Sequence, residues 1–252
     1  MGSIISIVNQ KGGVGKTTTA VNLTAALALA GKKALLCDFD PQSNATSGLG
    51  FDKSAASCTS YDVVINGRSA RDAVVHTAYG DLIPSAASLS GAGVELVGVE
   101  RREFVLKNAL APLREEYDYI FVDCPPSLEL LTLNALCASD SILIPVQCEY
   151  YALEGLSDLM QTLRAVKRVL NPNLGIFGVL LTMYDGRTNF SAQVAEEVRR
   201  HFPGKVFASV IPRNVRLAEA PSHGVPVSAY DRFSRGAAAY ENLAKEILSA
   251  ES

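Results

Sequence analysis

The chain has 252 residues, of which 48% are hydrophobic and 19% are charged, and its formal net charge is −3. This length suits one large α/β domain or two small ones, and the net charge excludes a protein that binds polyanions through its bulk charge. No apolar run approaches the roughly 20 residues of a membrane span, and the five cysteines lack the paired spacing of a zinc site or a disulfide framework. No signal peptide precedes the first apolar segment, so we expect a cytoplasmic protein that does not bind membranes.

The first element is a β-branched apolar run at residues 4–8, which predicts a buried strand. A glycine-rich loop follows, and an Ala/Leu-rich stretch then predicts a helix over residues 17–30 that stops at Gly31. This order of strand, glycine loop, Gly-Lys-Thr and helix is typical of a P-loop, which binds nucleotide phosphates through backbone N–H groups and a helix N-terminus. The predicted nucleotide-binding residues are Lys11, Gly12, Gly13, Val14, Gly15, Lys16, Thr17 and Thr18.

Two lysines distinguish this loop. Lys16 is expected to bind the β- and γ-phosphates, and the Thr17 hydroxyl is expected to hold Mg²⁺. The usual pattern has glycine at position 10, but here Gln10 stands there and a second lysine, Lys11, follows it. A second cation would neutralise phosphate charge as an arginine finger does, so we interpret Lys11 as catalytic, like Lys16, rather than as a solvated loop residue.

Carboxylates follow two further predicted strands. The strand at residues 33–39 runs into Asp38 and Asp40, and ligands of open α/β sheets bind at such strand ends. The apolar strand at residues 119–124 closes on Asp123, which is typical of a Walker B segment when a P-loop lies upstream. Asp123 is therefore expected to hold a Mg²⁺-bound water.

Apolar periodicity predicts the remaining elements, while residues 54–79 indicate no clear structure or chemistry. We expect strands at 81–86, 141–147, 176–183 and 206–211, and helices at 101–115, 153–170, 192–202 and 240–248. Strands that alternate with helices favour a mostly parallel sheet with helices on both faces. The fold class is therefore α/β, with about seven or eight strands in a single P-loop NTPase domain that spans residues 1–252.

One segment departs from the acidic average. Residues 185–235 carry eight Lys and Arg against five Asp and Glu, whereas the rest of the chain carries 15 against 21. Such a local positive excess favours contact with a polyanion through one surface.

Four segments carry a resemblance to a known family. They are KGGVGKTTT at 11–19, DFDPQSNATSGLG at 38–50, DYIFVDCPPS at 118–127 and IPRNVRLAEAPSHG at 211–224. Together they resemble the deviant-Walker partition ATPases of the ParA/Soj type, and the resemblance extends over nearly the whole chain.

The resemblance implies a role for each matching residue. Lys11 would reach across an ATP-sandwiched homodimer to the partner's nucleotide, and Asp40 would orient the attacking water as a catalytic residue. Asp38 and Asp123 would lie near Mg²⁺. The residues that would pack against and hydrogen-bond the adenine are Met183, Pro212 and Asn214. Those that would bind DNA without reading its sequence are Arg187 and Arg216.

The resemblance further implies an ATP-dependent dimerising switch that drives chromosome or plasmid partition. Such a protein hydrolyses ATP slowly to ADP and phosphate with Mg²⁺, and binds double-stranded DNA non-specifically. A ParB-type partner and DNA would stimulate hydrolysis, and the protein would associate with the nucleoid in the bacterial cytoplasm.

Alternatives remain at this point. A ParA-like ATPase could position another cargo, such as a protein cluster or a microcompartment. A MinD-like membrane switch needs a basic amphipathic C-terminal helix, but the tail from Gly236 carries Glu241, Glu246 and Glu251 against Lys245. A nitrogenase-reductase-like protein needs two cluster-binding cysteines per subunit, and a small-molecule ligase needs a substrate loop that the sequence does not show.

Overall fold

The central strands are apolar on both faces because helices cover the sheet on both sides. The computed structural model describes residues 1–149 and 152–250. On the first strand, β1 (Ser3–Ile7), Ile4 joins one hydrophobic core while Ile5 and Ile7 join a second core on the opposite face. On β2 (Ala34–Asp38), Leu35 and Leu36 divide between the same two cores. This burial on both faces explains why the strands are continuous apolar runs.

The described residues form one seven-stranded sheet in the order β3-β4-β2-β5-β1-β6-β7. All neighbouring pairs are parallel except the edge pair of β3 and β4. The predicted α/β class with a mostly parallel sheet is therefore confirmed. The strands are β1 (Ser3–Ile7), β2 (Ala34–Asp38), β3 (Val75–Thr77), β4 (Gly80–Ile83), β5 (Tyr119–Asp123), β6 (Ser141–Gln147) and β7 (Gly175–Thr182).

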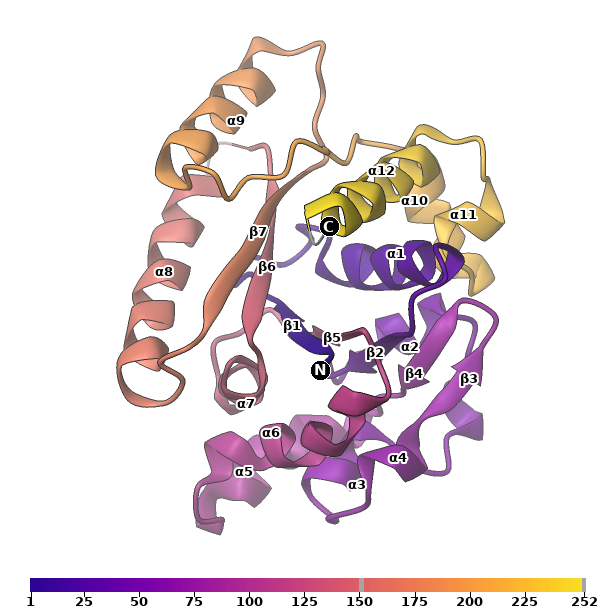
Figure 1. The fold of residues 1–252 in the computed structure, drawn as a ribbon, viewed down its shortest axis with the longest axis vertical. Helices are drawn as coiled ribbons and strands as arrows, with labels where there is room; N and C mark the ends of the chain where they lie inside the picture. Colours follow the sequence, from indigo (N-terminus) through magenta and orange to yellow (C-terminus); the bar gives the residue numbers. More distant parts are fainter. Residues whose placement is uncertain (150–151, 251–252) are drawn as a thin grey trace.

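Two helix layers enclose the sheet (Figure 1). The α-helices are α1 (Lys16–Leu29), α2 (Asn44–Gly48), α3 (Ser60–Val64), α4 (Ala70–Ala73), α5 (Ala92–Glu95), α6 (Val105–Leu110), α7 (Leu130–Ala138), α8 (Ala152–Val169), α9 (Asn189–His201), α10 (Val215–Glu219), α11 (Val227–Tyr230) and α12 (Arg235–Ala250). Helices α1 and α12 pack side by side on one face, and α6, α7 and α8 contribute to the core on the other. In the described part of the chain, no helix is long and apolar enough to cross a bilayer.

Short 3-10 helices complete the connections. They span Lys53–Ala55, Ala87–Gly91, Leu96–Gly98, Arg102–Phe104, Ala111–Glu115 and Ala220–His223. The segment 54–79, for which the sequence indicated no structure, contains α3, α4 and the edge strand β3. These elements are only three to five residues long, too short to produce a periodic pattern.

The strand predicted at 206–211 is wrong as a continuous strand. Its two ends bond to β7, since Phe207 N–H donates to Val179 and Ile211 N–H donates to Leu181. Between them, the backbone N–H groups of Ala208 and Ser209 donate instead to the Glu246 carboxylate on α12, at 2.7 and 2.8 Å. A side chain distant in sequence thus replaces the ladder bonds, which no local pattern reveals.

The helix predicted at 101–115 is also wrong in length. The structure has a 3-10 turn at Arg102–Phe104, the short helix α6, and a second 3-10 helix at Ala111–Glu115. Pro112 lies at the start of that second helix and lacks the N–H that a continuous α-helix requires. The apolar side chains still face the core, because Leu106, Leu110 and Leu113 are all buried.

Candidate functional site

The carboxyl ends of the central strands bring the predicted nucleotide-binding segments to one edge of the sheet. Asp38 on β2 and Ile7 on β1 are both register partners of Asp123 on β5. The P-loop leaves β1 at this point, and Asp40 follows β2 two residues after Asp38. Three segments far apart in sequence therefore meet at the edge where parallel sheets bind ligands.

The P-loop takes a conformation that only glycine adopts without strain. Gly13 and Gly15 have φ angles of 73° and 90°, in the left-handed region. Gly15 precedes α1, and no side chain of the described residues caps that helix N-terminus. Its backbone N–H groups and positive dipole end are thus available to an anion. The loop geometry fits phosphate as the sequence predicts.

Lys16 is held inside the loop. Its side chain is 7% exposed, and its Nζ donates to the Lys11 carbonyl at 3.2 Å. Burial lowers the pKa of Lys16, while the nearby carboxylates Asp123 and Asp40 raise it in part. A buried cation surrounded by carboxylates and directed at a phosphate-binding loop fits the predicted role in binding the β- and γ-phosphates.

Two side chains that the sequence analysis did not single out hold the loop in place. Asn9 accepts from the Lys11 N–H at 3.0 Å and donates its amide to the Pro145 carbonyl at 2.7 Å. Thr182, the last residue of β7, donates its hydroxyl to the Val14 carbonyl at 2.8 Å. Both lie at strand ends on the ligand-binding edge, and that position is the signal that points to them.

The two buried aspartates differ in how they are satisfied. Asp38 accepts from the Thr46 N–H at 2.7 Å and the Thr46 hydroxyl at 2.6 Å, whereas neither oxygen of Asp123 has a hydrogen-bond partner among the described residues. Burial raises the pKa of Asp38 to about 6, and the bonds from Thr46 limit the rise. Burial and the neighbouring Asp38 raise the pKa of Asp123 well above its usual range. The Thr17 hydroxyl opposes this rise but forms no bond of ordinary geometry with Asp123.

These residues fit a magnesium ion. A buried carboxylate with no partner is costly and indicates a missing cation or hydrogen-bond donor. Asp123 and the Thr17 hydroxyl offer the oxygen ligands that Mg²⁺ prefers. Among the described residues there is no group of three or more His, Cys, Asp or Glu side chains that could hold a metal ion. Asp38, already bonded to Thr46, is placed to support this site.

Asp40 is held rigidly at the edge of the same site and is 8% exposed. Its carboxylate accepts from the Gln42 N–H at 2.9 Å, and its carbonyl accepts from the Ser85 hydroxyl at 2.8 Å. The second carboxylate oxygen is left for another hydrogen bond, such as one from a water.

The predicted base-binding residues all line one cavity of about 150 Å³ beside the P-loop. Its lining includes Gly15, Thr18, Met183, Pro212 and Asn214, together with Leu217 and Tyr240, which the sequence analysis did not identify. Met183 has a left-handed φ of 50°, and Asn214 caps α10 by accepting from the Arg216 N–H at 2.9 Å. The structure therefore brings the three predicted adenine contacts to the P-loop.

The Lys11 side chain forms an ion pair with a residue outside its own loop. Its Nζ lies 3.5 Å from the Glu149 carboxylate, and its side chain is 36% exposed. The same carboxylate lies 3.6 Å from the Arg213 guanidinium. Glu149 follows β6 at the ligand-binding edge but was not predicted, because a single glutamate after a strand carries no recognisable pattern.

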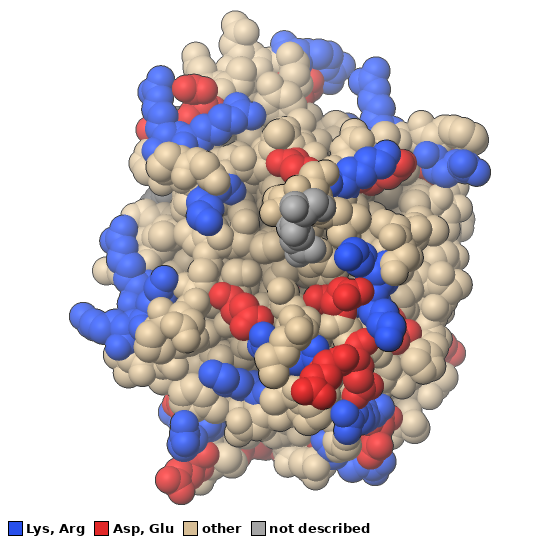
Figure 2. Space-filling model, in the orientation of Figure 1, with Lys and Arg blue, Asp and Glu red and all other residues tan. Residues whose placement is uncertain are grey.

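The predicted DNA-contact arginines are exposed and already paired. Arg187 forms two bonds to Asp185, at 2.9 and 2.7 Å. Arg216 lies 2.8 Å from Glu219 and 3.3 Å from Asp231. On the side of the molecule shown in Figure 2, blue and red side chains are interspersed and do not form one continuous positive surface. The local excess of cations is real, but ion pairs compensate much of it.

Known proteins are similar in sequence to the chain that forms this site. A family model described as "AAA domain" matches residues 2–176. The chain is 57% identical to the sporulation initiation inhibitor protein Soj of Bacillus subtilis over 99% of both chains. It is 54% identical to the chromosome partitioning protein ParA of Myxococcus xanthus, over 98% of this chain and 88% of that one.

A solved structure shares the whole fold. It is a Mycobacterium smegmatis protein described as cobyrinic acid a,c-diamide synthase, with bound ADP and magnesium. The TM-score is 0.87 at 36% identity, covering 100% of this chain and 96% of that one. ADP and magnesium are bound by that protein, and the predicted P-loop and magnesium residues of this chain are consistent with the same pair of ligands.

Proposed function

The chain belongs to the Soj/ParA family of chromosome-partitioning ATPases, and from this premise we propose that it is a dimerising switch that binds DNA only in its ATP state. It is an ATPase, and its cofactors are ATP and Mg²⁺. What we add as a proposal is the homodimer, the non-specific contact with duplex DNA, and stimulation by a ParB-type partner in chromosome or plasmid partition.

The observation that carries the proposal is the contrast between the two loop lysines. Lys16 is buried in the phosphate-binding loop, so one cation already serves the nucleotide of its own subunit. The Lys11 side chain is instead 36% exposed and lies beside Glu149, which follows β6. A second lysine in this position gains a phosphate partner when another subunit faces it. ATP bound between two subunits would then stabilise the dimer, and hydrolysis would remove that stabilisation.

The remaining site residues have distinct proposed roles in hydrolysis. Asp40 orients the attacking water, since it is fixed by Gln42 and Ser85 and keeps an acceptor oxygen. Thr17 and Asp123 hold Mg²⁺, with Asp38 in support; the ion neutralises charge on the phosphates. Met183, Pro212 and Asn214 surround the adenine. With positioning and charge neutralisation alone, hydrolysis is expected to be slow until a partner completes the site.

DNA binding is proposed for the segment with the local positive excess. Arg187 and Arg216 would exchange their carboxylate partners for DNA phosphates, and a dimer would double the number of contacts. A protein that acts in this way would associate with the nucleoid in the bacterial cytoplasm.

Two alternative functions lose support in the structure. The apolar face of α12 is buried against the domain, including Tyr240, Leu243 and Ile247, so it is not available to lie on a membrane. Glu251 of the acidic tail lies outside the described residues. All five cysteines are buried, whereas an iron–sulfur cluster shared between subunits needs cysteines at the subunit surface.

The test is binding to random-sequence duplex DNA with ATP, with ADP and without nucleotide, at two salt concentrations. We expect binding with ATP only, weakened by salt, and an ATP-dependent rise in molecular mass. Binding to DNA without nucleotide, or no binding in any state, would overturn the switch. Dimerisation without DNA binding would instead favour a family member that positions another cargo through protein contacts.

A further inference from the structure

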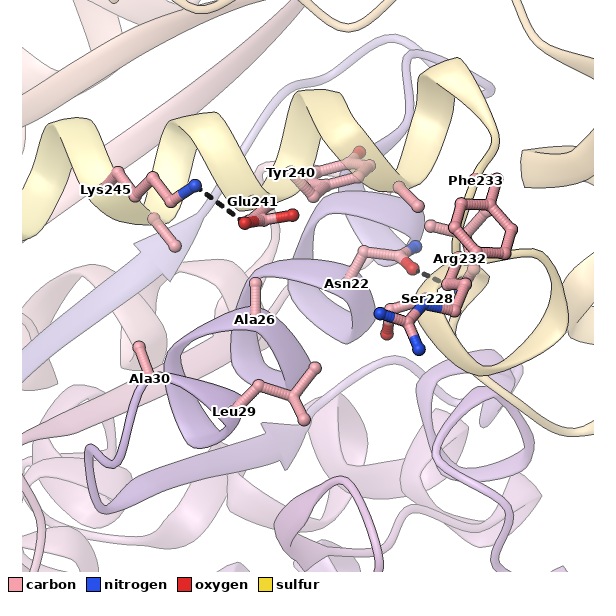
Figure 3. Close-up of a pocket in the computed structure, with 13 residues that line it drawn as sticks. Asn22, Ala26, Leu29, Ala30, Ser228, Arg232, Phe233, Tyr240, Glu241 and Lys245 are labelled. Carbon is pink, nitrogen blue, oxygen red and sulfur yellow. Dashed lines mark hydrogen bonds and ion pairs between the residues drawn. The ribbon is translucent and has the colours of Figure 1, made fainter.

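Tyr240 connects the C-terminal helix to the phosphate-binding helix. It lies on α12, 2% exposed, and its hydroxyl is hydrogen-bonded to the Thr19 hydroxyl on α1 at 3.1 Å. Figure 3 shows its side chain between the two helices. Thr19 also donates its backbone N–H to the Gly15 carbonyl, so it belongs to the turn that forms the phosphate-binding helix N-terminus.

The same tyrosine lines two cavities. One is the cavity beside the P-loop that is proposed for the adenine, which Tyr240 lines together with Thr18 and Leu217. The other is a groove of about 730 Å³ between α1 and α12 (Figure 3). The hydroxyl thus contacts the helix that serves the phosphates, while the same residue borders the space proposed for the base.

A second connection supports the same segment. Asn22 on α1 donates its amide to the Thr18 carbonyl at 2.7 Å and accepts from the Val227 N–H, also at 2.7 Å. Val227 begins α11, and Figure 3 shows Asn22 directed toward this segment. The start of α1 is therefore held from the C-terminal side at two points, through buried polar groups whose geometry is narrowly defined.

We propose that Tyr240 is a positioning residue for ATP, which aligns the phosphate-binding turn of α1 with the wall of the adenine cavity. This inference rests on the proposed location of the nucleotide. Loss of the hydroxyl alone loosens the phosphate-binding turn of α1. Loss of the ring also removes part of the wall of the adenine cavity. Burial raises the pKa of the Tyr240 phenol, so its hydroxyl stays protonated.

The experiment compares Tyr240→Phe with Tyr240→Leu in the full chain. One neutral hydrogen bond changes an equilibrium by roughly twofold to tenfold, so we expect Tyr240→Phe to raise the KM for ATP by that factor. The kcat at saturating ATP should change less than about twofold, because the hydrolytic groups are untouched. Inorganic tripolyphosphate, which has no base, should lose affinity to a similar degree. Tyr240→Leu should weaken the binding of ATP more than the binding of tripolyphosphate.

The matched control is Tyr119→Phe, which removes a hydroxyl from another buried tyrosine, at the amino-terminal start of the central strand β5, four residues before Asp123. Thr19→Val should reproduce Tyr240→Phe, and the double variant should be no worse than either single one. If Tyr240→Phe binds ATP and tripolyphosphate like Tyr119→Phe, the residue only stabilises the fold and the inference is wrong. If the unaltered chain binds no ATP, the proposed nucleotide site itself fails.

Discussion

The nucleotide-binding edge and the arginine-bearing segment 185–235 hold their charges in opposite ways. At the edge, Lys16, Asp38 and Asp123 are buried, and both oxygens of Asp123 lack a hydrogen-bond partner among the described residues. In the segment, Arg187 and Arg216 are exposed, and each is already paired with carboxylates of the same subunit.

This difference teaches what each region requires. A buried carboxylate without a partner is costly, so we propose that a cation and its phosphates complete this edge when they bind. An exposed ion pair contributes little to stability, and its members exchange partners at small cost. We therefore expect substitutions at the edge to have large effects, and substitutions in the segment to have graded effects that depend on salt.

The largest expected effect is on the rate of ATP hydrolysis, in which we propose that Asp40 orients the attacking water. Removing a group that orients the nucleophile lowers kcat by about 100-fold to 10,000-fold, so Asp40→Ala should bind ATP, dimerise and stall. Asp40→Asn keeps an acceptor for the Gln42 N–H while removing the charge, which separates chemistry from loop geometry. Measurement of phosphate release at saturating ATP decides the point. Near-normal turnover in both variants would exclude Asp40 from catalysis.

A somewhat smaller effect is expected on nucleotide affinity. Lys16→Ala removes a buried cation from the phosphate site, and truncation of one member of a buried charge pair weakens binding by at least about 30-fold. Titration with a fluorescent ATP analogue measures the change. Lys33→Ala is the control, because that lysine is exposed beyond the far end of α1. Retained affinity in Lys16→Ala would contradict the P-loop interpretation.

The same contrast explains which parts of the molecule could be predicted from the sequence. The strands that carry the site are long apolar runs buried on both faces, and their ends place Asp38 and Asp123 side by side by register alone. The glycines of the loop are required by φ angles that other residues avoid. Local patterns therefore fixed the location of most site residues.

The features that could not be predicted depend on contacts between distant segments. Glu246 replaces the ladder of the strand expected at 206–211, and Tyr240 reaches Thr19 across 221 positions. Glu149 acquires its importance only because Lys11 lies beside it. The pairing of Arg187 with Asp185 is local but exposed, and a count of charges cannot reveal it. Tertiary packing decides the contacts of Glu246, Tyr240 and Glu149.

An intermediate effect is expected when a DNA-contact arginine is reversed. Arg216→Glu removes a cation and leaves Glu219 and Asp231 without their partner, so repulsion of phosphate adds to the lost contact. In a dimer the slope of log Kd against log salt should fall by about two, one for each copy. ATP-dependent dimerisation should persist. The control is Arg71→Glu, since Arg71 is also exposed and paired, with Glu116. Loss of dimerisation together with DNA binding would mean that Arg216 is structural.

The smallest expected effect has the opposite sign. Asp185→Asn removes the carboxylate that holds Arg187, whose ion pair keeps the pKa of Asp185 well below its usual range. An exposed pair contributes little because solvent screens it, so the released arginine should tighten DNA binding by only about 1.5-fold to fivefold, and only with ATP. Glu116→Gln releases Arg71 in the same way and changes the net charge equally, so it measures the general electrostatic effect. If the two variants gain affinity for DNA equally, or if Asp185→Asn weakens binding, Asp185 does not compete with DNA for Arg187. In that case the carboxylate instead orders the loop that presents Arg187.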